Sequence, residues 1–140
     1  MIEQRMKKIL VPLDGSKNSI RSLNKAIYLA REHEATLVFV HVVHRLPKKE
    51  GKIAPEKGIS QDEPTFLLTA RMLAKKNGIA SSGRILTGDP GHVIVDYSHT
   101  HNVDLIVIGS RGLGTFKKVF LGSVSSYVMQ KANMAVMVIK

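Results

Sequence analysis

The sequence contains no cysteine and no tryptophan among its 140 residues. Without cysteine, neither a disulfide framework nor a thiolate metal site can form, and a reducing compartment is compatible with the composition. No apolar run approaches the roughly 20 residues that a membrane-spanning helix needs. The first eight residues, MIEQRMKK, also lack the long apolar region of a signal peptide. We therefore expect a soluble, cytoplasmic protein with no membrane partner.

Acidic residues are also scarce, with 11 Asp and Glu against 21 Lys and Arg, so that the formal net charge is +10. Five of the basic residues fall in the segment 45–60, whose prolines, glycines and glutamates are typical of a solvated loop. Whether this loop gates a site or contacts partners is left open by the sequence. The few aromatic residues do not alternate with basic ones as a base-stacking surface would. Specific nucleic-acid binding is therefore not expected, although weak, salt-sensitive adsorption to polyanions is.

Apolar segments alternate with amphipathic ones along the whole chain. Strands are predicted at residues 8–13, 36–43, 80–87, 103–108 and 134–139, and the helical stripes between them lie within 20–30, 66–74, 93–97 and 121–132. Strands separated by helices require crossover connections, which favour a mostly parallel sheet with helices on both faces. At this length, the chain is predicted to form one α/β domain, residues 1–140.

Capping residues support these boundaries. Ser16 is a predicted N-cap for the first helix, and Asp89 followed by Pro90 predicts the start of the third. Asn77 and Gly78 are a typical helix end. In such a sheet, ligands bind beyond the carboxyl ends of the strands. The segments 12–14, 41–43 and 109–112 are therefore predicted to line one crevice.

A glycine-rich segment follows the fourth predicted strand. Gly109 and Gly112 are followed by nine residues and then by Gly122 and Ser123, where a helical pattern begins. Glycines let backbone amides approach a ligand closely, and a helix N-terminus favours an anion, so phosphate is the expected ligand. The spacing is neither a Walker loop nor a dinucleotide fingerprint, because Gly-Lys-Ser/Thr is missing and the segment does not follow the first strand.

The pattern Gly-x2-Gly-x9-Gly-Ser resembles the nucleotide loop of the ATP-binding branch of the universal stress protein family. The segments KKILVPLDGS, HV, GDP and VDLIVIGSRG and the closing apolar strand extend the resemblance to essentially the whole chain. It implies a Rossmann-like sheet of five strands in the order 3-2-1-4-5, as in adenine nucleotide alpha hydrolases. It also implies a homodimer, paired through the last strand, which starts at Met134 and ends at Ile139. Left unpaired, that strand would be an exposed apolar edge.

The resemblance also implies which residues contact ATP. Adenine would lie near Pro12 and the backbone of Val42, and Asp14 would face the adenosine. The remaining positions belong to the loop: Gly109 would lie beside the ribose, and the phosphates would be wrapped by Gly112, Gly122, Ser123 and Val124. We add Arg111 as a phosphate ligand on charge alone. Mg²⁺ or Mn²⁺ would be carried by the phosphates rather than by a protein metal site.

Several of these residues have a simpler structural interpretation. Asp14 taken alone is better explained as a turn or capping residue, and only together with the glycine loop does ligand contact become the preferred interpretation. Gly109 and Gly112 suit a tight turn, but the long connection with a second Gly-Ser at its far end favours ligand binding. The neighbouring lysines, Lys117 and Lys118, are expected to be solvated.

Asp104 and the histidines are not predicted to be catalytic or metal-binding residues. Asp104 is interpreted as a hydrogen-bonding residue at the start of a buried strand, and His41 as structural rather than catalytic. His92, His99 and His101 do not predict a metal site, because no carboxylate cluster accompanies them and histidines two residues apart near a helix end diverge.

Three functions remain as hypotheses. The first, which we favour, is a nucleotide-dependent regulatory dimer in the stress response. The second is a slow ATPase or phosphotransferase acting in the same crevice. It is less favoured, because phosphoryl transfer needs a positioned water or acceptor and the sequence offers no obvious base, so no catalytic residue is assigned and at most weak hydrolysis is expected. The third is a basic adaptor for nucleic acid or an acidic partner. The sequence leaves open whether ATP, ADP, AMP or another adenosine ligand is preferred.

Overall fold

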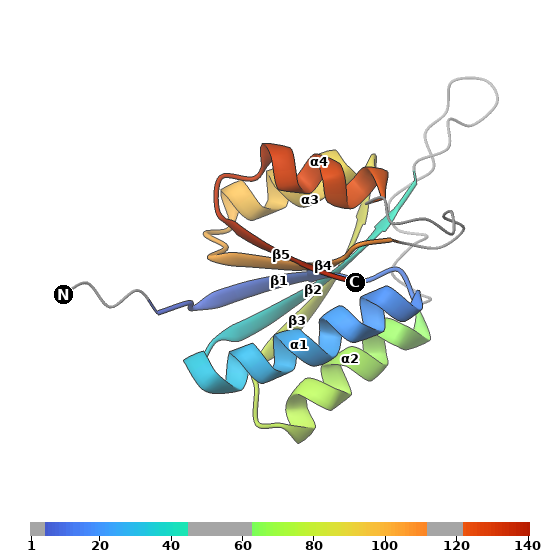
Figure 1. Cartoon of the computed structure of the whole chain (residues 1–140). Coiled ribbons are helices and arrows are strands. Elements are labelled where there is room, and N and C mark those ends of the chain that lie inside the picture. The colour runs from blue at the N-terminus through green and yellow to red at the C-terminus, as the bar shows by residue number, and fades with distance from the viewer. Residues whose placement is uncertain (1–4, 45–62, 112–121) are drawn as a thin grey trace.

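A parallel sheet forms the centre of the molecule, with helices on both faces (Figure 1). The computed structural model describes residues 5–44, 63–111 and 122–140. The strands are β1 (Lys8–Pro12), β2 (Thr36–Val43), β3 (Ser81–Thr87), β4 (Leu105–Gly109) and β5 (Ala135–Ile139). The helices are α1 (Lys17–His33), α2 (Thr65–Lys76), α3 (Pro90–Thr100) and α4 (Ser123–Lys131). The predicted segment 45–60 lies outside the described residues.

The strand order is β3-β2-β1-β4-β5, and each neighbouring pair is parallel. This confirms the fold class and the order predicted above. Helices α1 and α2 cover one face of the sheet, and α3 and α4 cover the other (Figure 1). The order reverses at β1, because the chain passes to β2 on one side of it and reaches β4 on the other. Such a switch point leaves a crevice at the carboxyl ends of the strands.

The continuous apolar runs of the central strands are explained by burial on both faces. Ile9 and Phe39 belong to the core cluster that includes residues of α1 and α2. Leu10 and Val38, one position away in each strand, belong to the second cluster, which includes residues of α3 and α4. Because successive strand residues point to opposite faces, a strand between two helical layers is apolar at most of its positions.

The predicted caps are present. The Ser16 hydroxyl accepts a hydrogen bond from the backbone N–H of Ser19 at 3.2 Å, and Asp89 accepts one from the N–H of His92 at 3.3 Å. Gly78 follows α2 with a φ of +73°, which is the left-handed conformation expected after a helix. These local signals predicted the starts of α1 and α3 and the end of α2 correctly from the sequence alone.

The strand boundaries differ from the predicted ones by at most two residues, and the largest difference is at the start of β4. The apolar pattern predicted a strand from residue 103, whereas β4 begins at Leu105. The reason is Asp104, whose carboxylate accepts hydrogen bonds from the backbone N–H groups of Lys7 and Lys8 at 2.8 and 3.0 Å. The side chain thus ties the start of β4 to the start of β1, which agrees with the structural role expected for Asp104.

None of the helices in the described part of the chain is both long and apolar enough to cross a membrane.

Candidate functional site

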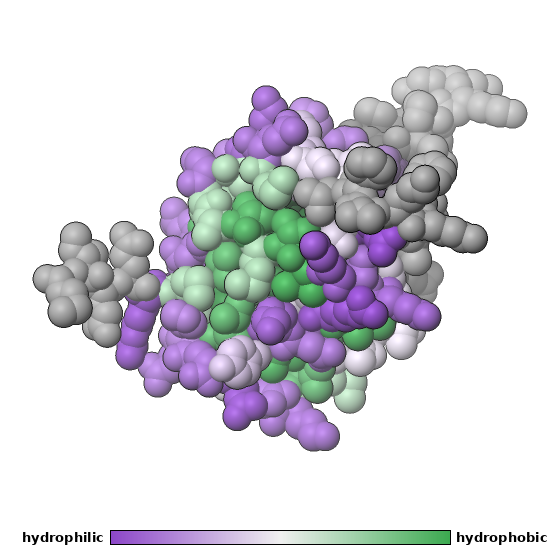
Figure 2. All heavy atoms as spheres, viewed as in Figure 1, coloured by the Kyte–Doolittle hydropathy of each residue, from purple (hydrophilic) through white to green (hydrophobic). Residues whose placement is uncertain are grey.

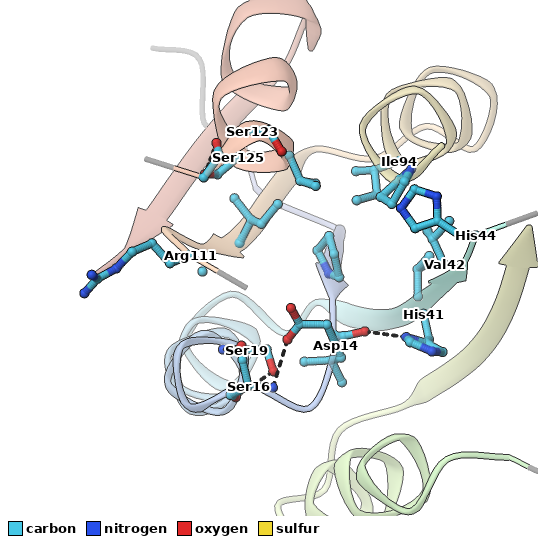
Figure 3. Close-up of a pocket in the computed structure, with 18 residues that line it drawn as sticks. Asp14, Ser16, Ser19, His41, Val42, His44, Ile94, Arg111, Ser123 and Ser125 are labelled. Carbon is cyan, nitrogen blue, oxygen red and sulfur yellow. Dashed lines mark hydrogen bonds between the residues drawn. The ribbon is translucent and has the colours of Figure 1, made fainter. Parts of the chain in front are cut away.

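The carboxyl ends of β1, β2 and β4 surround a cavity of about 380 Å³, at the switch point of the sheet (Figure 3). Cavities of this size are typical of small-molecule sites. Eight of the nine residues predicted above to contact ligand line it: Pro12, Asp14, Val42, Gly109, Arg111, Gly122, Ser123 and Val124. The ninth, Gly112, lies outside the described residues, as do Lys117 and Lys118. Segments more than 100 residues apart in sequence, such as Pro12 and Ser123, therefore share one cavity.

One wall of the cavity is formed by the last residues of β2, which extends beyond the end of its neighbour β1. The pairing of the two strands stops at Pro12 and Val40, with a last hydrogen bond of 2.8 Å from the N–H of Leu13 to the carbonyl of Val40. Alternate residues of a parallel strand direct their N–H and C=O groups to the same neighbour. Val42 therefore directs both groups to the side of β2 that β1 has already left. This main-chain edge offers one donor and one acceptor next to the cavity.

Asp14 lies in the turn that follows β1. Its carboxylate accepts a hydrogen bond from the backbone N–H of Ser16 at 2.9 Å, while Gly15 between them adopts a φ of +84°. This geometry is that of an Asx turn, in which an aspartate stabilises the backbone two residues on. The same side chain lines the cavity (Figure 3). Turn formation and ligand contact are thus compatible at this position.

A second wall is formed by the start of α4. The carbonyl of Ser110 accepts hydrogen bonds from the N–H of Gly122 at 2.7 Å and from the hydroxyl of Ser125 at 2.9 Å. These bonds join the end of β4 to the beginning of α4. The N-cap of α4 is Gly122, which has no side chain to accept from the first helical amides.

The three helices α1, α3 and α4 all begin at the cavity, which Ser16, Pro90 and Ser123 line. Helix α1 is capped by Ser16 and α3 by Asp89, whereas α4 has no side-chain cap. Helix N-termini carry partial positive charge, and unpaired amides donate to anions. With Arg111 also in the wall, the cavity can accommodate a ligand that combines an apolar part with an anionic group.

Gly109 has a packing role besides its place in the cavity. A Cβ at this position would lie 2.9 Å from Cβ of Asn18 and 3.0 Å from its carbonyl carbon. Only glycine lets the end of β4 approach α1 so closely. The structural explanation of this glycine thus stands on its own, and a ligand contact at Gly109 remains a prediction.

Leu13 and His41, which also line the cavity, belong to the segments 12–14 and 41–43 that were predicted to line the crevice. The sequence did not indicate the other lining residues, namely Ser16, Ser19, Val40, His44, Pro90, Ile94, Ile108 and Ser125. His44 directly follows β2, and Pro90 begins α3. Their positions at a strand end and at a helix start were the sequence features that could have indicated a place in the cavity. The Nδ1 atom of His41 donates to the carbonyl of Leu13 at 2.9 Å, and its ring meets Phe66 edge-on at 5.0 Å. These contacts agree with the structural role expected for His41.

The three histidines considered above as metal ligands, His92, His99 and His101, each contact a different residue. His92 is hydrogen-bonded to the Tyr127 hydroxyl at 2.9 Å, and His99 accepts from the backbone N–H of Asn133 at 3.3 Å. His101 stacks on Tyr97 with ring centroids 3.8 Å apart. Among the residues that the structure describes, no three His, Asp or Glu side chains are grouped as metal ligands would be.

Comparison with known proteins agrees with this architecture. The Universal stress protein family model matches residues 6–140. The universal stress protein YxiE of Bacillus subtilis is 30% identical over 145 aligned residues, which cover 95% of this chain and 98% of that protein. Two solved structures are similar over almost their whole lengths. UspA of Lactobacillus plantarum has a TM-score of 0.81 and 27% identity, with 99% of this chain and 100% of that one covered. A universal stress protein of Archaeoglobus fulgidus in complex with dAMP has a TM-score of 0.71 and 27% identity, with 96% and 98% covered. Because the family model spans all five strands and all four helices described here, the chain belongs to the universal stress protein family.

Proposed function

We propose that this protein binds an adenine nucleotide in the cavity at the switch point, and that the preferred ligand is ATP with Mg²⁺ or Mn²⁺ on its phosphates. We further propose that it acts as a homodimeric, nucleotide-dependent regulator in the stress response. The observation that carries the proposal is the convergence of eight predicted contact residues, from separate parts of the chain, on one cavity of about 380 Å³.

The base would lie against the end of β1. Adenine presents an amino donor at N6 and an acceptor at N1, which complement the C=O and the N–H of Val42. Pro12 and Ile94 give this part of the cavity an apolar lining. Asp14 would accept from a ribose hydroxyl while keeping its turn-forming bond to Ser16. The main chain of Val42 thus supplies base selectivity without any polar side chain.

The phosphates would lie at the start of α4. The amides of Ser123 and Val124 belong to the first turn of a helix whose N-cap is glycine, so a phosphate oxygen would serve as the missing cap. Ser123 and Arg111 line the cavity, and Figure 3 shows the Arg111 side chain extending away from Ser123, so contact of its guanidinium with a phosphate would require another rotamer. Gly112 is assigned here as well, on the sequence motif alone. A divalent ion would need only phosphate oxygens and water as ligands.

The relative from Archaeoglobus fulgidus supports the adenine assignment. It is 27% identical to this chain, shares its fold, and was solved in complex with dAMP. That ligand contains adenine, a sugar and one phosphate, which are the three groups that the cavity would receive. Preference for the triphosphate is our own step, based on the uncapped start of α4 and on Arg111.

The dimer would form through β5. This strand lies at the edge of the sheet and pairs with β4 on one side. Figure 2 shows a hydrophobic area, bordered by hydrophilic residues, on the face of the molecule where Figure 1 has β5. Residues Val136 and Val138 are only half-buried in the single chain. A second copy of β5 would cover this area and pair its edge, which proteins rarely leave exposed.

Calorimetric titration of the nucleotide-stripped protein with Mg-ATP tests the proposal, with AMP and GTP as comparison ligands. We expect micromolar binding of ATP and weaker binding of AMP and GTP. No heat at millimolar ATP would overturn the nucleotide assignment. Phosphate release measured in the same samples separates binding from slow hydrolysis.

A further inference from the structure

The carbonyl oxygen of Ser110 is a fixed point between the end of β4 and the start of α4. It accepts two hydrogen bonds from the α4 side, at 2.7 Å from the N–H of Gly122 and at 2.9 Å from the hydroxyl of Ser125. Ser110 is itself held in place. Its N–H donates to the carbonyl of Ile139 at 2.7 Å, and its hydroxyl accepts from the side chain of Asn18 at 3.3 Å. The acceptor is therefore anchored to both β5 and α1.

The two donors on α4 have different consequences. A single bond from Gly122 fixes the position at which the helix starts but leaves it free to pivot about that point. Ser125 lies three residues further on, so its side chain returns to the same side of the helix. A second bond to the same carbonyl therefore fixes the direction of the first turn, and with it the direction of the amides at Ser123 and Val124.

The hydrogen bond from the Ser125 hydroxyl to the Ser110 carbonyl is buried rather than exposed to solvent. Ser125 is 2% exposed, and yet it also lines the cavity. Its hydroxyl lies 3.1 Å from the carbonyl of Gly122, three residues earlier in the same chain segment, which is the ordinary partner of a helical serine. The shorter bond, however, goes to Ser110, fifteen residues away. By contrast, the buried Ser98 donates only to Val95 within its own helix, at 2.7 Å.

We propose that Ser125 is a positioning residue for the phosphate-binding end of the cavity, which holds the first turn of α4 against Ser110 so that its amides face the ligand. This inference rests on the proposed nucleotide function. Ser125 would not contact the ligand; it would act through the amides of the residues before it. Its removal should therefore weaken binding of the phosphates and leave binding of the adenosine part unchanged.

The test compares the affinities of ATP and adenosine in the wild type and in Ser125→Ala. We expect the ratio of ATP affinity to adenosine affinity to fall about tenfold in Ser125→Ala, the size of effect that one lost hydrogen bond produces. Ser125→Thr keeps the hydroxyl and should restore the ratio. Ser98→Ala is the matched control, because it removes an equally buried hydroxyl from α3 and should lower thermal stability without changing the ratio.

A second measurement does not depend on ligand. Amide hydrogen exchange at Ser123–Ser125 in the ligand-free protein should be faster in Ser125→Ala than in the wild type, relative to exchange in the first turn of α3. If Ser125→Ala does not fold, Ser125→Cys keeps the volume with a much weaker donor and takes its place.

The outcomes distinguish two failures. An unchanged affinity ratio in a folded Ser125→Ala protein overturns the positioning role and leaves the nucleotide proposal intact. A fall in both affinities by the same factor also overturns it, because that result indicates a general structural role. A wild-type protein that binds neither ATP nor adenosine overturns the nucleotide function, and the positioning role with it.

Discussion

Gly109, the last residue of β4, lies directly against Asn18 of α1. A Cβ at Gly109 would lie 2.9 Å from Cβ of Asn18, closer than Cβ atoms approach other non-bonded atoms in folded proteins, and 3.0 Å from its carbonyl carbon. The contact brings α1 next to the end of β4, so that Ser16 and Ser19 form part of the cavity wall. A requirement for close packing and a candidate ligand position thus coincide at one residue.

Gly109→Ala should therefore destabilise the fold. The added methyl group meets main-chain atoms of Asn18, which cannot move without a shift of α1, and such overpacking costs about 1–3 kcal/mol. Thermal denaturation should show a melting temperature lower by several degrees. The control is Gly83→Ala in β3, where the nearest atoms, 3.3 Å away, belong to the flexible Arg71 side chain. Equal melting temperatures for the two variants would contradict the packing role.

Gly122→Val should abolish ATP binding without unfolding the protein. Gly122 has a φ of −65° and a ψ of 163°, which other residues adopt readily, so no backbone strain is introduced. A Cβ there lies 3.3 Å from the Ser110 carbonyl, and the branched side chain would occupy space at the start of α4. Calorimetry measures the affinity, while circular dichroism checks the fold and gel filtration checks that the oligomeric state is that of the wild type. If Gly122→Val bound ATP with the affinity of the wild type, the start of α4 would not be part of the binding site.

Inosine triphosphate should bind at least about tenfold more weakly than ATP. It differs in having a carbonyl at C6 and a proton at N1, so both groups would oppose those of Val42 with the wrong polarity, and each unpaired buried group is costly. Competition calorimetry with the two triphosphates isolates the base, because their phosphates are identical. Equal affinities for ATP and inosine triphosphate would show that the main chain of Val42 does not form the proposed hydrogen bonds with the base.

Val138→Pro should convert the proposed dimer into a monomer. Ile139 directs its carbonyl to Ser110 on the β4 side, so Val138, one position earlier, directs its N–H to the free edge. Proline removes this N–H while leaving the ladder with β4 intact. Light scattering should then give a mass near 15.4 kDa instead of twice that value.

The control for this variant is Val138→Thr, which keeps the N–H and should remain dimeric. A dimeric Val138→Pro protein would place the interface elsewhere on the molecule.

Much of the fold follows from local signals in the sequence. Continuous apolar runs such as β2 indicate strands buried on both faces, because successive side chains point to opposite sides. Ser16 and Asp89 mark helix starts, because their side chains bond to amides three residues away. The strand order, in contrast, was implied by the family resemblance, since periodicity alone does not determine which strands pair.

The tertiary structure decided what these elements bring together. β4 starts two residues later than predicted because the carboxylate of Asp104 bonds to Lys7, 97 residues away, which no local pattern could indicate. The same holds for the bond from Ser125 to Ser110 and for the place of His44 in the cavity. Hydrophobic periodicity and capping act over a few residues and are therefore visible in the sequence. Contacts across the sheet depend on how crossovers place distant strand ends, and only the folded chain determines them.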